Sequence, residues 1–68
     1  MTEVLARYEW MGNFILDGVA YKAAGRVPDF SGCGLGDRDM GWVCKSEIET
    51  EKIKRGLQRA GFRVEIKP

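Results

Sequence analysis

The dipeptide Asp17-Gly18, which lies between two apolar runs, constrains the possible folds of this chain most strongly. Asp-Gly is typical of a two-residue β-hairpin turn, which needs positive φ at both central residues. We therefore predict a hairpin over residues 8–27. Its register separates an apolar face from a polar one, which supports the prediction; the apolar pairs are Tyr8/Val27, Trp10/Gly25, Gly12/Ala23, Phe14/Tyr21 and Leu16/Val19. An alternative interpretation places the turn at Gly12-Asn13 and leaves a short strand over residues 14–16.

The length and composition predict one small globular domain over residues 1–68. The 68-residue chain is near the lower limit for a domain that folds alone. A hydrophobic content of 44% with 31% charged residues argues against disorder. The net charge of +1 gives no overall attraction to nucleic acid or to membranes. Because the sequence contains neither a membrane-spanning apolar run nor a signal-type N-terminal segment, we expect a cytoplasmic protein of a bacterium or of a virus that infects one.

The other elements are predicted from periodicity and capping signals. Alternation favours strands over residues 2–9 and 62–67, and β-prone residues favour a short strand over 42–45. Ser46 and Glu49 form a capping-box pattern that begins a helix over residues 46–60, and Gly61 ends it. Its predicted buried stripe consists of Ile53, Leu57 and Ala60, while Ile48 is expected to pack at the edge. Gly56 is expected to let the helix backbone approach the sheet closely.

These elements define the predicted fold class, which is α+β. We expect a two-layer sandwich in the order β-β-β-α-β, with one helix packed on one face of a small, mostly antiparallel sheet. The predicted helix stripe would cover part of the apolar face of the hairpin. The opposite sheet face would be solvated or covered by a partner.

Residues 28–41 are predicted to form a long glycine-rich loop. Four of these fourteen residues are glycine and three are aspartate. Loops of this length are usually functional or disordered, and Phe30, Leu35 and Met40 are apolar residues that a solvated linker does not need. The glycines do not match a phosphate-binding motif, because no Lys-Ser/Thr follows them. Asp37 and Asp39 have the spacing of a calcium loop, but the later glycine and glutamate of an EF-hand are missing.

The residue types present argue against common catalytic centres. The chain has no histidine and two cysteines, Cys33 and Cys44. A zinc site with four Cys or His ligands and a His-activated nucleophile therefore cannot form within one chain. In a cytoplasmic protein we expect both cysteines to be thiols, with Cys44 a small buried residue on a strand. We predict that the protein is not an enzyme and needs no cofactor or metal.

The leading functional hypothesis is a small protein-binding module that occupies a surface of a larger protein or complex. Aromatic residues, Met and Arg are typical interface anchors. The predicted partner-binding residues are Phe30, Leu35, Asp37, Arg38, Asp39, Met40 and Trp42. A second expected contact is the polar hairpin face, which carries Arg7, Glu9, Met11 and Lys22. In its small size, near-neutral charge and lack of catalytic residues, the chain is similar in kind to phage-encoded inhibitors such as anti-CRISPR proteins, although no motif identifies a family. That likeness implies an anti-defence inhibitor.

Two alternative hypotheses remain open. Residues 45–68 contain seven Lys or Arg against four Glu, which suggests a nucleic-acid-binding accessory module. Its basic stripe would consist of Lys52, Arg55, Arg59 and Arg63. The other alternative is a homo-oligomeric structural protein that pairs through the uncovered sheet face or short edge strands. We therefore expect a monomer or a small homo-oligomer that does not enter membranes.

Overall fold

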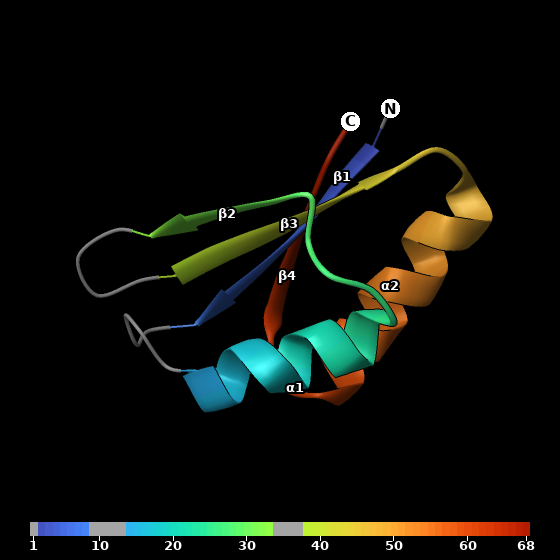
Figure 1. The fold of residues 1–68 in the computed structure, drawn as a ribbon. Coiled ribbons are helices and arrows are strands. Elements are labelled where there is room, and N and C mark those ends of the chain that lie inside the picture. The colour runs from blue at the N-terminus through green and yellow to red at the C-terminus, as the bar shows by residue number, and fades with distance from the viewer. Residues whose placement is uncertain (1, 9–13, 34–37) are drawn as a thin grey trace.

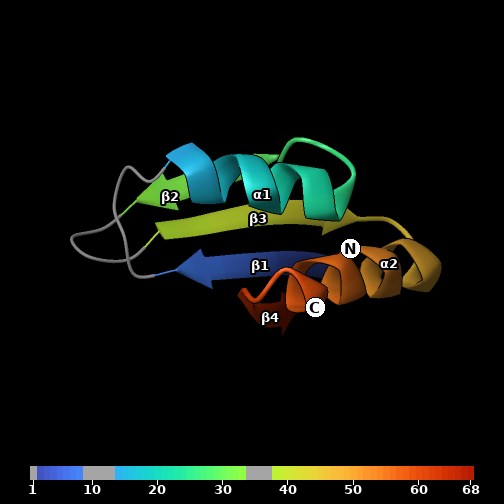
Figure 2. The same cartoon turned by 90° about the horizontal axis from the view of Figure 1, so that it is seen from below.

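A computed structural model describes residues 2–8, 14–33 and 38–68 (Figure 1). Within these ranges the chain forms six elements, in the order β1 (Thr2–Tyr8), α1 (Phe14–Ala24), β2 (Phe30–Cys33), β3 (Arg38–Cys44), α2 (Glu47–Arg59) and β4 (Arg63–Lys67). Helices α1 and α2 lie on the same face of the sheet (Figures 1 and 2). The predicted two-layer α+β class is thereby confirmed.

The strands are ordered β2-β3-β1-β4, and each neighbouring pair is antiparallel. Strands β1 and β2 are consequently parallel to one another, with β3 inserted between them. This β-α-β-β-α-β arrangement with a split βαβ unit is the ferredoxin-like topology. The topology supports many unrelated functions, so the function has to be argued from the surface.

The predicted hairpin over residues 8–27 is wrong, because Asp17-Gly18 lies inside helix α1. The alternative strand over residues 14–16 is wrong for the same reason, while its turn at Gly12-Asn13 lies outside the described residues. Apolar residues occur all around α1, so their spacing suits a strand pair as well as a helix. The helix ends at Gly25, whose φ of 79° places it in the left-handed region. The observed order is therefore β-α-β-β-α-β, with two helices. Helix α1 takes the place of the long hairpin in the predicted order β-β-β-α-β.

A hairpin does occur further along the chain, between β2 and β3. It occupies most of the predicted loop over residues 28–41, with Phe30 paired with Gly41 and Cys33 paired with Arg38. The loop prediction is therefore wrong for residues 30–33 and 38–41. The predicted short strand over residues 42–45 corresponds to the second half of β3, which ends at Cys44 and does not include Lys45. Glycines in both strands weakened the sequence signal, because glycine has a low strand propensity.

Helix α2 confirms the prediction at both of its ends. The Ser46 Oγ accepts a hydrogen bond from the Glu49 backbone N–H at 3.2 Å. The Glu49 carboxylate accepts from the Lys45 backbone N–H, one residue earlier than in a regular capping box. At the C-terminal end, Gly61 has φ 92°, and its N–H donates to Gln58 O while the N–H of Phe62 donates to Leu57 O. This is a Schellman motif.

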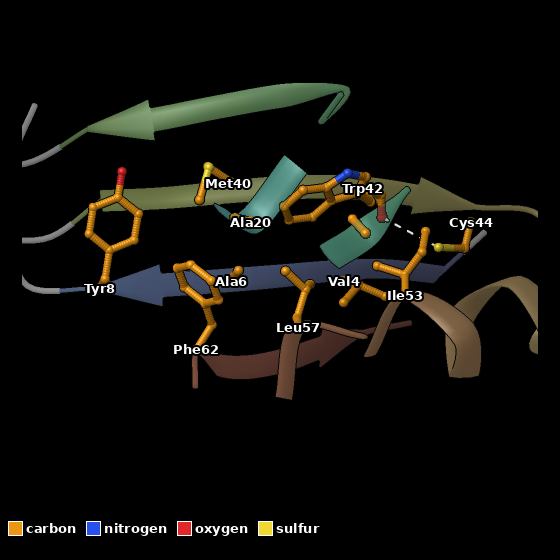
Figure 3. Packing of buried hydrophobic residues seen from close by; sticks show 11 residues of the cluster. Val4, Ala6, Tyr8, Ala20, Met40, Trp42, Cys44, Ile53, Leu57 and Phe62 are labelled. Carbon is orange, nitrogen blue, oxygen red and sulfur yellow. Dashed lines mark hydrogen bonds between the residues drawn. The ribbon is translucent and has the colours of Figure 1, made fainter. Parts of the chain in front are cut away.

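The core lies between the sheet and the helices (Figure 3). Alternate residues of β1 and β3 point toward the helices, as strand geometry requires. The buried core residues include Val4, Ala6, Tyr8, Ala20, Ala24, Met40, Trp42, Cys44, Ile53, Leu57 and Phe62. Ile53 and Leu57 confirm the predicted helix stripe, but Ala60 is exposed and does not belong to it. Cys44 is a buried free thiol, as expected.

Gly56 permits a close approach of two helices. A Cβ atom at this position would lie 2.2 Å from the carbonyl oxygen of Ala23, near the end of α1. The predicted close approach therefore exists, but its partner is α1 and not the sheet. The sequence interpretation could not identify that partner, because it placed Ala23 in a strand.

Candidate protein-binding surface

The outward face of α1 carries uncovered aliphatic side chains. Ile15 is 79% exposed and Val19 is 41% exposed, and one helical turn separates them. Lys22, three residues after Val19, is also exposed on this side. The opposite side of the helix buries Ala20 and Ala24 in the core. Helix α1 is thus anchored by Ala20 and Ala24, with Leu16 and Tyr21 also packed against the core, and it presents Ile15 and Val19 to the outside.

A groove adjoins this face between α1 and α2. Its volume is about 710 Å³. Ala23 and Gly56 line it where the two helices meet, and the 83% exposed side chain of Ile48 adds an aliphatic group. The charged residues that line it are Glu47, Glu51, Lys52, Arg55 and Arg59. Because Ile48 is so exposed, the expectation that it packs at the edge of the buried helix stripe is wrong. The groove is a combined apolar and charged surface.

A polar cluster fixes the connection between α1 and β2. The Arg26 guanidinium contacts the Asp29 carboxylate at 3.1 Å and the Glu49 carboxylate at 2.7 Å. The Asp29 carboxylate accepts from the Val43 backbone N–H at 2.7 Å. The buried indole N–H of Trp42 donates to the Arg26 carbonyl at 2.9 Å. These contacts connect the end of α1 to β3 and to the first turn of α2, so the two helices are held in one arrangement.

A second polar contact fixes the start of α1. The Tyr8 hydroxyl at the end of β1 donates to the carboxylate of Asp17, which is buried. Asp17 lies in the first turn of the helix, where the helix dipole favours a negative charge. The Tyr8 ring also packs edge-on against Phe62, with 5.9 Å between the ring centroids. This carboxylate therefore joins α1 to β1, which is a structural role.

The predicted partner-binding residues do not form one exposed surface. Met40 and Trp42 are fully buried in the core, so the prediction that they contact a partner is wrong. Their alternation with Cys44 was the signal for an inward-facing strand. The structure places Phe30 on β2 and places Arg38 and Asp39 on β3, and for these three residues the contact remains a prediction. Leu35 and Asp37 lie outside the described residues.

The second predicted contact, the polar face of the hairpin, is not formed. Arg7 lies on β1 and Lys22 lies on the exposed side of α1, so they belong to different layers. Glu9 and Met11 lie outside the described residues. The contact surface of α1 was missed because Ile15 and Val19 were assigned to strands. In the sequence, the one indication of an exposed apolar surface was the position of Ile48 outside the buried stripe of α2.

The predicted basic stripe is divided between two places. Lys52, Arg55 and Arg59 line the groove between the helices. Arg63 instead lies on β4, beside Arg7 and Glu65. Arg7 is ion-paired with Glu65 at 3.6 Å. The prediction that these four residues form one basic surface is therefore wrong.

Two further properties concern only the part of the chain that the structure describes. Within it, His, Cys, Asp and Glu side chains form no group of three or more that could hold a metal ion. Neither α1 nor α2 is long and apolar enough to cross a membrane. No family model, curated protein or solved structure matches this chain.

Proposed function

We propose that the chain is a small, non-enzymatic protein-binding module that occupies a surface of a larger protein or complex with the outward face of α1. One observation carries the proposal, namely the exposure of Ile15 and Val19 one turn apart on a helix. Apolar side chains with this spacing are the anchors by which helices bind in protein grooves. Full burial of a fully exposed side chain of this size contributes about 1.5–3 kcal/mol, of which Ile15 would supply most and Val19 less than half, because Val19 is only 41% exposed.

The chemistry of this surface favours a protein partner over a nucleic acid. Nucleic-acid affinity comes mainly from cations that contact phosphates. Among the described side chains on this side of α1, Lys22 is a cation and Ile15 and Val19 are aliphatic. The contacts of Arg26 and Tyr8 hold α1 in place before binding, which lowers the entropic cost of association. A phage-encoded anti-defence inhibitor, as the sequence suggested, would act in this manner.

The test compares capture of a partner by three forms of the chain. These are the natural chain, the double variant Ile15→Gln/Val19→Gln, and the control variant Ile66→Gln. Ile66 is 39% exposed on β4, which matches the exposure of Val19 on a different element. Each form is immobilised in a lysate of the organism that encodes it, and the captured protein is then purified for calorimetric titration.

We expect the natural chain and the control to hold the same stoichiometric partner with equal affinity. The double variant should bind about 100-fold more weakly, because two apolar anchors are lost. Equal affinity of all three forms would contradict the proposed surface. Absence of any stoichiometric partner would contradict the proposed function.

The second candidate function, nucleic-acid binding, is supported by the position of Lys52, Arg55 and Arg59 along one groove. Cations in a row can follow a phosphate backbone. Against it, Arg55 already contacts Glu51 at 3.5 Å, and two glutamates line the same groove. Titration of labelled single-stranded and duplex oligonucleotides distinguishes the candidates, because phosphate binding weakens steeply with added salt whereas burial of Ile15 and Val19 does not.

A further inference from the structure

The face of α2 that lines the groove between the helices carries an ordered row of charges. Glu47, Glu51, Arg55 and Arg59 follow one another at intervals of four residues, so they form one stripe along the helix. All four residues are exposed. The stripe is acidic in its N-terminal half and basic in its C-terminal half. The 83% exposed side chain of Ile48 lies next to its acidic end.

Among the described residues, contacts within the chain use only the middle of this stripe. Arg55 contacts Glu51 at 3.5 Å, and Lys54 contacts the other oxygen of Glu51 at the same distance. Neither Glu47 nor Arg59 forms a salt bridge with another residue that the structure describes. The helix dipole favours acids at the start of a helix and bases at its end. It gives no reason for the exposed Ile48 beside them.

The order of the charges makes the stripe complementary to itself. A second copy of α2, laid antiparallel across the first, brings Glu47 opposite the partner's Arg59 and Glu51 opposite the partner's Arg55. The two-fold axis repeats both pairs, which gives four pairs of opposite charge in one symmetric contact. Ile48 at the edge of the stripe adds an apolar side chain from each copy.

We propose that the chain forms a two-fold symmetric dimer, in which α2 of one copy packs antiparallel against α2 of a second copy. This inference rests on other residues than the proposed partner surface, because Ile15 and Val19 lie on α1 and the stripe lies on α2, in the adjoining groove. It also differs from the oligomer expected from the sequence, which paired through the sheet. The contact depends on charge, so it weakens as ionic strength rises.

The experiment is a charge exchange followed by sedimentation equilibrium at low salt. The variant E47R/E51R makes the stripe wholly basic, and the variant R55E/R59E makes it wholly acidic. Each variant alone places like charges opposite one another, and should associate at least tenfold more weakly than the natural chain. An equimolar mixture of the two should recover association as a heterodimer. The variant with all four exchanges restores opposite pairs and should self-associate again.

Controls separate loss of the contact from loss of the fold. Circular dichroism of each variant checks that α2 is intact, and recovery in the mixture requires that both components are folded. The variant Ile48→Gln leaves every charge in place and should weaken the dimer, because each copy loses an apolar side chain from the contact. Mixing this variant with either charge variant should not restore association. A natural chain that remains monomeric at millimolar concentration overturns the proposal, as does equal association of all variants. Partner capture by the monomeric R55E/R59E variant tests the proposed function separately.

Discussion

Helices α1 and α2 differ in how their sequences specify a helix. Helix α2 has polar residues outside, with the exception of exposed Ile48, and a narrow buried stripe of Ile53 and Leu57, with defined capping at both ends. Helix α1 has apolar residues on every side, and its outward face includes exposed Ile15. The first pattern is compatible with one structure, whereas the second is compatible with a helix or a pair of strands. The comparison teaches that a segment with an ambiguous apolar pattern can leave large apolar side chains uncovered in the folded structure.

The largest expected effect on stability is the difference between a substitution on the buried side of α2 and one on the exposed side of α1. Leu57→Ala removes a fully buried side chain and leaves a cavity, so it should lower the free energy of unfolding by about 2–5 kcal/mol. Ile15→Ala removes a side chain that is mostly in water and should change it by less than about 0.5 kcal/mol. Urea unfolding of both variants measures the difference. Similar losses for the two would mean that Ile15 is part of the core.

A smaller effect tests the contact between the two helices. Gly56→Ala gains about 1 kcal/mol of helix propensity in α2. The added methyl, however, would lie 2.2 Å from the backbone oxygen of Ala23, so the helices must separate. We expect a net destabilisation of about 1–3 kcal/mol, the usual range for overpacking. A stabilised Gly56→Ala variant in thermal unfolding would refute the close approach of α1 and α2.

The smallest effect decides directly between a helix and a hairpin at Asp17-Gly18. In α1, a methyl at position 18 would meet no atom within 4 Å, and Gly18 has no positive φ. Gly18→Ala should therefore stabilise the protein by about 0.5–1 kcal/mol. In a type I′ turn the same substitution would destabilise it, because alanine is strained at positive φ. The measurement is the urea midpoint of unfolding, which should rise if position 18 is in a helix and fall if it is in a hairpin turn.

The part of the fold that could be predicted is the part with a single local interpretation. Strict alternation over residues 62–67 predicted β4, and the Ser46 and Gly61 signals located the ends of α2. The β2–β3 hairpin was missed, because its pairing depends on a partner strand and not on the propensities of glycine-rich residues 30–41. The candidate surface was missed for a related reason, since exposure of Ile15 and Ile48 depends on what packs beside them.

By itself, the sequence determined the α+β class, strands β1 and β4, and helix α2 with its caps. Each depends on signals a few residues apart, namely alternation, a side chain that caps a helix and a glycine at positive φ. Tertiary structure alone decided that residues 14–24 are helical. A helix over 14–24 buries Ala20 and Ala24 while Gly56 admits the backbone of Ala23, and these contacts join residues far apart in the chain. Helix α2 could be predicted because local signals specify it, whereas helix α1 could not, because it depends on contacts between residues far apart in the chain.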